Sequence, residues 1–123
     1  LLVGPEVISG STRLKAGTAT KMVLNMITTG AMVLIGKTLG NRMIDFTPVN
    51  EKLRIRARRM LRELAEVDEA RAVELLAAAG GRLKVALVME LAGVEPAEAE
   101  ALLQAHGGLV RKAVQAKTGA SRI

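Results

Sequence analysis

A long stretch of apolar residues near the start of the chain predicts its first element. Residues 22–36 contain no charged side chain, and residues 26–35 are apolar on nearly every side, which is typical of a helix that other elements enclose. Because nothing breaks a helix before Gly36, the pattern predicts one long helix over residues 11–37, with a kink expected at residues 28–30. The uncharged run is shorter than the roughly 20 residues that span a bilayer, so it is not expected to enter a membrane.

A break separates this helix from the next one. Gly40 and Asn41 favour a turn, and Pro48 keeps the residue before it out of helical geometry, so residues 42–49 are expected to be extended or turn-like. Asn50 is then a good N-cap, and a glutamate stands in the first helical turn after it. The apolar positions that follow have the spacing of a single buried stripe: Leu53, Ala57, Met60, Leu61 and Leu64.

From residue 67 the sequence repeats itself with an offset of 27 residues. Segments 67–81 and 94–108 align, and each predicts a helix that ends in a Gly-Gly pair and turns into a second helix. Two such helical hairpins are expected to pack as a compact four-helix module. Its expected core consists of Leu75, Leu76, Leu83, Leu87, Leu91, Leu102, Leu103, Val110 and Val114. A helix-turn-helix can bind DNA, but the repeats lie in a half of the chain without net charge, so a docking or scaffold module is favoured.

Composition indicates an aliphatic core. Apolar residues make up 50% of the 123, yet Phe46 is the only aromatic residue. Alanine, leucine, valine and methionine must fill the core, which favours close helix packing, and the fold class is predicted to be all-α. The chain has no cysteine and no visible secretory signal, and a cytoplasmic location is expected.

The net charge of +6 is concentrated in the first half of the chain. Residues 1–66 hold 11 lysine or arginine residues against 5 acidic ones, whereas residues 67–123 hold 7 of each. Much of the excess lies on the second helix: Arg54, Arg56, Arg58, Arg59 and Arg62. A basic helix can neutralise nucleic-acid phosphates, but Glu51, Glu63 and Glu66 can pair with these arginines and no aromatic residue is available for base stacking. A solvated face, or a face that packs on the acidic surface of a partner subunit, is therefore favoured over nucleic-acid binding.

The candidate binding chemistry lies at the start of the first helix. Ser9, Ser11 and Thr12 supply hydroxyl groups, while Arg13 and Lys15 stand where a helix normally prefers acidic residues. Because a helix N-terminus carries partial positive charge, an anion is expected there, and these groups together suit a phosphate. The alternative is an ordinary serine or threonine cap whose two cations point into solvent.

Two further features have simpler interpretations than catalysis or ligand binding. His106, the single histidine, could act as a general base, but its counterpart in the first repeat is Ala79, so a role at a helix end is favoured. Met22, Met26 and Met32 could line a ligand cavity, although methionines at helical spacing are more often core residues. No cofactor and no metal site is predicted.

Longer motifs give the sequence a family resemblance. The run Gly4-Pro5-Glu6-Val7-Ile8-Ser9-Gly10-Ser11-Thr12-Arg13-Leu14-Lys15, with Gly40-Asn41-x-Met43-x-Asp45 and Asn50-Glu51-Lys52-Leu53 after it, is similar to the C-terminal third of N-acetylmuramic acid 6-phosphate etherases. The family consists of sugar-isomerase-type domains, and the related glucokinase regulatory protein shares their architecture. The resemblance covers essentially the whole chain, since these enzymes end in a small helical module that resembles a ubiquitin-associated domain.

The resemblance implies a carbon–oxygen lyase that cleaves the D-lactyl ether of N-acetylmuramic acid 6-phosphate. The products would be N-acetylglucosamine 6-phosphate and D-lactate, released during cell-wall recycling. The two family glutamates that act as acid and base would lie upstream of residue 1, so the catalytic residues are unknown. The phosphate-binding residues would be Ser9, Ser11, Thr12, Arg13 and Lys15. The alternative implied by the regulatory protein is a non-catalytic sugar-phosphate sensor.

The resemblance also predicts three parts within what is expected to be the C-terminal piece of a longer protein. Residues 1–66 would form the end of an α/β sugar-isomerase-type domain with its linking arginine-rich helix, residues 67–117 the repeat module, and residues 118–123 a frayed tail. The chain alone is expected to be inactive, and its exposed apolar helix to self-associate. The longer protein is expected to be a homo-oligomer that binds an amino-sugar phosphate, with no membrane or nucleic-acid partner.

Overall fold

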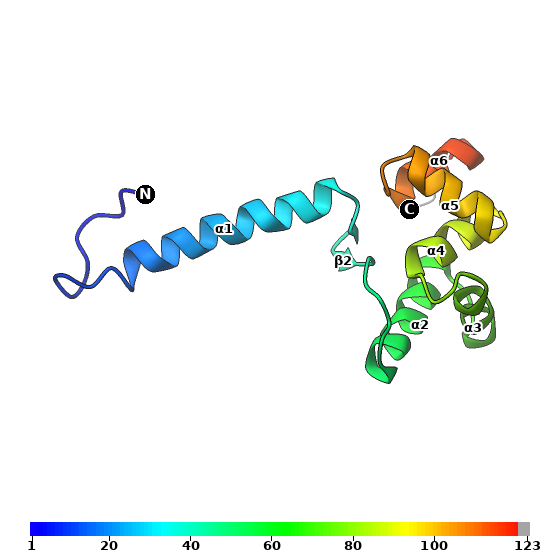
Figure 1. Cartoon of the computed structure of the whole chain (residues 1–123), viewed down its shortest axis with the longest axis horizontal. Helices are drawn as coiled ribbons and strands as arrows, with labels where there is room; N and C mark the ends of the chain where they lie inside the picture. Colours follow the sequence, from blue (N-terminus) through cyan, green and yellow to red (C-terminus); the bar gives the residue numbers. More distant parts are fainter. Residues whose placement is uncertain (121–123) are drawn as a thin grey trace. The chain divides into compact units, whose positions relative to one another are not determined.

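The computed structural model describes residues 1–120, which contain six helices and one two-stranded sheet (Figure 1). The helices are α1 (Lys15–Leu34), α2 (Glu51–Ala65), α3 (Glu69–Ala78), α4 (Leu83–Ala92), α5 (Pro96–Ala105) and α6 (Val110–Thr118). The strands are β1 (Thr38–Leu39) and β2 (Arg42–Met43), which pair antiparallel. The prediction of a mostly helical chain is confirmed, but the small sheet means that the fold is not all-α.

The chain divides into two compact units, Leu1–Leu34 and Ile35–Ile123. The predicted domain boundary at residue 67 stays a prediction; α2, which ends at Ala65, contacts both α3 and α4. Thr118, the first residue of the predicted frayed tail, is the last residue of α6. Residues 121–123 of that tail lie outside the described residues.

α1 is shorter than the predicted helix at both ends. It begins at Lys15, because the chain before it makes a turn in which the Ser11 N–H donates to the Ile8 carbonyl oxygen at 3.1 Å. It ends at Leu34, and Gly36 then has a φ of 74°, a left-handed conformation that a helix cannot continue through.

β1 and β2 form a hairpin that the sequence pattern did not predict. Leu39 pairs with Arg42 across a two-residue loop of Gly40 and Asn41. Gly40 has a φ of 57°, as the first central residue of a type II′ turn requires. Strands of two residues are too short for an alternating pattern to be visible in the sequence.

The predictions for α2 are confirmed. The Asn50 Oδ1 accepts a hydrogen bond from the Leu53 N–H at 2.9 Å, so Asn50 is the N-cap. Of the five positions in the predicted apolar stripe, the three central ones are buried and the two outer ones are half-buried. The buried face of α2 therefore completes the core of the repeat module.

The two predicted hairpins are α3 with α4 and α5 with α6, and their Gly-Gly turns match closely. Gly80 and Gly107 have φ values of 61° and 63°, and Gly81 and Gly108 have 77° and 75°. In each turn the second glycine N–H donates to the carbonyl oxygen of the leucine five residues earlier, at 2.7 Å in both cases. The residue that follows has a φ of −85° and a ψ of 103° in both turns. The sequence repeat is therefore also a structural repeat.

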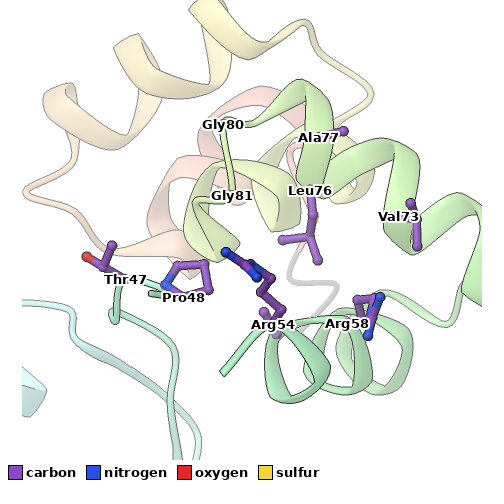
Figure 2. A pocket seen from close by; sticks show the side chains of 10 residues that line it. Thr47, Pro48, Arg54, Arg58, Val73, Leu76, Ala77, Gly80 and Gly81 are labelled. Atoms are coloured by element: carbon purple, nitrogen blue, oxygen red, sulfur yellow. The ribbon is translucent and has the colours of Figure 1, made fainter. Parts of the chain in front are cut away.

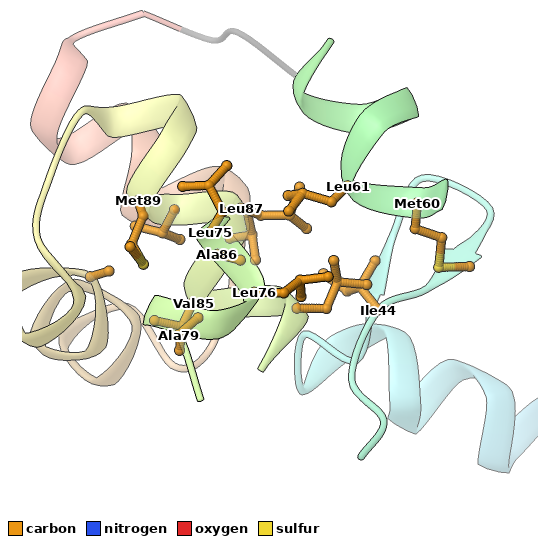
Figure 3. Packing of buried hydrophobic residues seen from close by; sticks show 14 of the residues in the cluster. Ile44, Met60, Leu61, Leu75, Leu76, Ala79, Val85, Ala86, Leu87 and Met89 are labelled. Carbon is orange, nitrogen blue, oxygen red and sulfur yellow. The ribbon is translucent and has the colours of Figure 1, made fainter. Parts of the chain in front are cut away.

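A single apolar cluster fills the unit that begins at Ile35. Ile44 and the α2 residues Met60 and Leu61 lie in one cluster with Leu76 and Leu87 (Figure 3). Within residues 1–120, no polar or charged residue is buried. Of the nine predicted core residues of the repeats, Leu91 and Leu102 are half-buried and the others are buried.

Small side chains allow the helices of this unit to approach closely. Six buried alanines have an exposed fraction of 0 or 1%: Ala57, Ala72, Ala79, Ala86, Ala99 and Ala113. Two pairs among them are related by the repeat offset, Ala72 with Ala99 and Ala86 with Ala113. The same places in both hairpins therefore need a side chain no larger than a methyl group.

Surface ion pairs connect the helices both between the two hairpins and within one of them. Arg82, at the start of α4, donates to the Glu100 carboxylate on α5. This hydrogen bond lowers the pKa of Glu100 and raises the pKa of Arg82 relative to their ordinary values. Within the second hairpin, Lys117 on α6 donates to the Glu98 carboxylate on α5 at 2.6 Å.

The segment before α2 crosses both Gly-Gly turns. A Cβ on Gly36 would lie 2.7 Å from the Gly108 carbonyl oxygen, so the two backbones are in close contact. At the other turn, a Cβ on Gly81 would lie 3.5 Å from the Pro48 Cγ. The incoming chain therefore packs on the second glycine of each turn, while the first glycine, Gly80 or Gly107, stays exposed.

We expect the Gly36→Ala variant to be less stable than the Gly40→Ala variant. Both glycines have positive φ, so both variants carry a left-handed strain of about 1–2 kcal/mol, but a Cβ on Gly40 would meet nothing within 4 Å. The clash with Gly108 should lower the free energy of unfolding of Gly36→Ala by a further ~1–3 kcal/mol. Urea denaturation followed by circular dichroism measures both values, and equal losses would contradict the close contact.

Candidate functional site

The predicted phosphate-binding residues lie together on the loop before α1 and at its first residue. Ser9, Thr12, Arg13 and Lys15 are exposed, and Ser11 is half-buried. The Thr12 carbonyl oxygen accepts a hydrogen bond from the Gly17 N–H, five residues further on, at 2.8 Å, which connects the loop to the first turn of α1. The segment therefore presents its hydroxyl and cationic groups near a helix N-terminus.

An internal carboxylate already occupies that N-terminus. The Glu6 Oε2 accepts from the Lys15 N–H at 3.0 Å, and its Oε1 accepts from the Ala16 N–H at 2.9 Å. The Lys15 Nζ donates to the Pro5 carbonyl oxygen at 2.9 Å, which holds the loop against the helix start. Glu6 thus satisfies two of the free N–H groups of α1 and places negative charge at the positive end of the helix.

This cap changes the argument made from the sequence. The first turn of α1 lacks an acidic residue, as the sequence showed. The negative charge at the helix start is instead the carboxylate of Glu6, nine residues before Lys15. The helix start therefore does not require an external anion. The assignment of a phosphate to the side chains of Ser9, Ser11, Thr12, Arg13 and Lys15 remains a prediction.

α1 exposes its apolar residues to solvent on all sides. None of its residues is buried, and Met22, Met26 and Met32 are among the exposed ones, so the structure places them neither in a core nor in a closed cavity. The helix continues through residues 28–30 as one element. Although α1 is rich in apolar residues, neither it nor any other helix among residues 1–120 has the length and hydropathy to cross a membrane.

The arginine-rich side of α2 is partly neutralised by glutamates. The ion pairs are Arg54 and Arg58 with Glu51, Arg58 and Arg62 with Glu69, and Arg42 and Arg59 with Glu63. Arg56 instead lies over the Phe46 ring, 5.3 Å from its centroid. Pairing by Glu51 and Glu63 was predicted, whereas Glu69 of α3 takes the place expected for Glu66. Five arginines share three carboxylates, so this surface keeps a positive excess.

His106 is at the C-terminal end of α5, as predicted. Its backbone N–H donates to the Leu102 and Leu103 carbonyl oxygens at 3.1 and 3.3 Å. Its counterpart Ala79 is fully buried while His106 is half-buried, which shows that the two turns are covered to different degrees. Over residues 1–120, no three acidic or histidine side chains are grouped so that they could hold a metal ion.

Fold and site together define a mostly helical polypeptide. No family model matches the chain. Curated relatives do match it, and eight of them, which are 53–61% identical to this chain, are named N-acetylmuramic acid 6-phosphate etherase. The chain is 58% identical over 88 residues to the one from Rhodopirellula baltica, 57% over 89 residues to the one from Synechocystis sp., and 61% over 87 residues to the one from Gloeobacter violaceus.

These matches cover 71 or 72% of this chain. The chain in turn spans 28 or 29% of the length of each of these relatives. The matched region of each relative is its C-terminal part. The family resemblance inferred from the sequence motifs is thereby confirmed: the chain is homologous to the C-terminal part of N-acetylmuramic acid 6-phosphate etherases.

We expect Glu6→Ala to loosen the start of α1. Because α1 buries no residue, its helicity depends on local interactions, and a lost cap costs about 0.5–2 kcal/mol. The amide hydrogens of Lys15 and Ala16 should exchange with solvent roughly tenfold faster, as a change of about 1.4 kcal/mol implies. Hydrogen exchange followed by NMR measures this rate.

A matched control is available at α5. Glu95 is the N-cap residue of that helix, but its side chain makes no capping hydrogen bond. Glu95→Ala should therefore leave the amide exchange of α5 unchanged. If Glu6→Ala had as little effect on α1, the carboxylate cap would not be present in solution.

Proposed function

We propose that this chain is the C-terminal part of an enzyme that cleaves the D-lactyl ether of N-acetylmuramic acid 6-phosphate. The reaction would release N-acetylglucosamine 6-phosphate and D-lactate, which makes the whole protein a carbon–oxygen lyase of cell-wall amino-sugar recycling. The observation that carries the proposal is the identity of 53–61% to curated relatives of that name over about 72% of the chain.

In this proposal the chain provides structural elements and substrate contacts, and the catalytic acid and base come from another part of the protein. The family acid and base glutamates are proposed to lie in the part of the relatives that the chain does not span. The carboxylates of the arginine-rich surface are held by arginines, and Glu6 is held by two backbone N–H groups. We therefore expect the 123 residues alone to be inactive.

The proposed substrate contacts are the side chains around the start of α1. Ser9, Ser11 and Thr12 offer hydroxyl groups, and Arg13 offers a guanidinium suited to a phosphate. Because Glu6 occupies the N–H groups of Lys15 and Ala16, the phosphate would be held by these side chains rather than by the helix N-terminus. Lys15 would contribute its ammonium group, which in this structure donates to a backbone carbonyl.

The remaining parts take supporting roles. Residues 1–66 are proposed to continue a sugar-isomerase-type domain, whose other elements would cover the exposed apolar side chains of α1. Residues 67–117 would form the ubiquitin-associated-like module, with α2 packed against it. The whole protein is proposed to be a cytoplasmic homo-oligomer.

A second candidate is a non-catalytic sugar-phosphate sensor of the kind represented by the glucokinase regulatory protein. It would use the same phosphate contacts without cleaving the ether. The names of the relatives favour the etherase.

We expect the longer protein that contains this chain to release D-lactate from N-acetylmuramic acid 6-phosphate, and the 123-residue chain to release none. In the longer protein, Arg13→Ala should raise KM about tenfold or more, with a smaller effect on kcat, because it removes a contact made in both the ground state and the transition state. Coupled measurement of D-lactate gives both constants.

Lys21→Ala is the matched control, since Lys21 is an exposed cation further along α1. It should leave KM within about twofold of the unmodified value. Binding of the sugar phosphate without D-lactate release would support the sensor, and equal effects of the two variants on KM would remove the assignment of Arg13 to the phosphate.

A further inference from the structure

A groove with apolar walls opens between α2 and the turn that joins α3 to α4. Its volume is about 380 Å³, and its apolar lining includes Pro48, Ala57, Val73 and Leu76. Figure 2 shows Leu76 of α3 and Arg54 of α2 directed into the same space beside Pro48. This volume lies toward the lower end of the range of about 300–1,000 Å³ for ligand sites, so the groove suits a short stretch of peptide.

The groove is open because of the residues that border it. Gly80 and Gly81 line it at the turn and have no side chains to fill it. Val73 is 45% exposed although it is a β-branched aliphatic residue on a helix whose other face is buried. An apolar side chain of a partner placed here would cover Val73 and the edge of Leu76, which is favourable.

Two guanidinium groups flank these apolar walls. The side chains of Arg54 and Arg58 are 59% and 31% exposed, and both pair with the single carboxylate of Glu51, at 3.5 and 3.1 Å. Arg58 also reaches Glu69 at 3.5 Å, but Glu69 is shared with a further arginine. Arg54, Arg58 and Arg62 therefore share only two carboxylates, those of Glu51 and Glu69. The positive charge that remains at the edge of the groove favours the binding of a further carboxylate.

This combination favours a peptide over a nucleic acid. Nucleic-acid sites use a basic surface with aromatic residues for base stacking, whereas the groove lining is aliphatic and the chain's single aromatic ring, Phe46, is covered by Arg56. Carboxylates bind guanidinium groups with charge-assisted hydrogen bonds, and an aliphatic side chain between them would fill the groove.

We propose that this groove binds an acidic peptide segment of a partner protein, with one aliphatic side chain against Val73 and Leu76 and flanking carboxylates on Arg54 and Arg58. The interaction is independent of the proposed etherase activity, because it uses the surface between α2 and α3 and none of the residues before α1. The affinity for the peptide should fall with added salt, because salt screens the charges of the arginines. It should also fall when the aliphatic side chain is removed, because that side chain packs against the apolar walls.

Fluorescence anisotropy on the full 123-residue chain tests the proposal. The probe is a fluorescein-labelled pentapeptide with a central leucine between two pairs of glutamates. Arg54→Ala should weaken its binding about tenfold, as expected when a charge-assisted hydrogen bond is lost. Arg59→Ala is the matched control, because Arg59 lies on the same helix, carries the same charge, is 71% exposed and does not line the groove. It should change the affinity less than about twofold.

Two comparisons separate the groove from a general charge effect. A probe with serine in place of the leucine should bind several-fold more weakly, and an unlabelled single-stranded oligonucleotide of equal charge should not displace the original probe. The proposal is overturned by any one of three results: no binding of the probe, equal weakening by Arg54→Ala and Arg59→Ala, or displacement by the oligonucleotide. Circular dichroism of each variant confirms that it is folded.

Discussion

The left-handed conformation of two Gly-Gly turns determines how the unit from Ile35 onward is built. At each turn, positive φ at both glycines reverses the chain directly after one helix and starts the next. The absence of side chains also leaves room for the preceding segment, so Gly36 rests on the Gly108 backbone and Pro48 contacts Gly81. The same pair of residues thus forms the hairpin and provides the surface on which the chain before α2 packs.

The start of α1 depends on a different interaction, the carboxylate of Glu6. This residue belongs to the Gly-Pro-Glu motif of the family resemblance, and here it binds the N–H groups of Lys15 and Ala16. Its role at the helix start is structural in this chain: it supplies the negative charge that the first helical turn lacks. A phosphate near this loop would meet a helix end that is already neutralised, and so would be recognised through side chains.

The features that could be predicted from the sequence are those set by local interactions. Asn50 as an N-cap, the Gly-Gly ends of α3 and α5, and the repeat itself depend on residues close together in the chain. The hairpin of β1 and β2 was missed because two residues give no periodic pattern. The Glu6 cap was missed because the carboxylate comes from a loop nine residues before the helix, and only the folded loop brings it there.

In the candidate site, too, the features set by nearby residues could be predicted and those set by distant residues could not. Charge counting identified the arginine excess on α2, and helical spacing identified the partners Glu51 and Glu63. The groove could not be predicted, since Val73 and Leu76 belong to the repeat while Arg54 belongs to the preceding helix. Nothing in the sequence indicates that α2 packs across the first hairpin, because its apolar stripe would fit any neighbouring surface.

The buried alanines have a consequence for how this unit can change during evolution. Where Ala72, Ala86, Ala99 and Ala113 sit between helices, even one added carbon would push neighbouring backbones apart, whereas the ion pairs around them are on the surface and individually weak. Substitutions should therefore accumulate at the charged surface positions, while the distances between the helices stay the same. Related proteins could in this way acquire new surface specificities on an unchanged arrangement of helices.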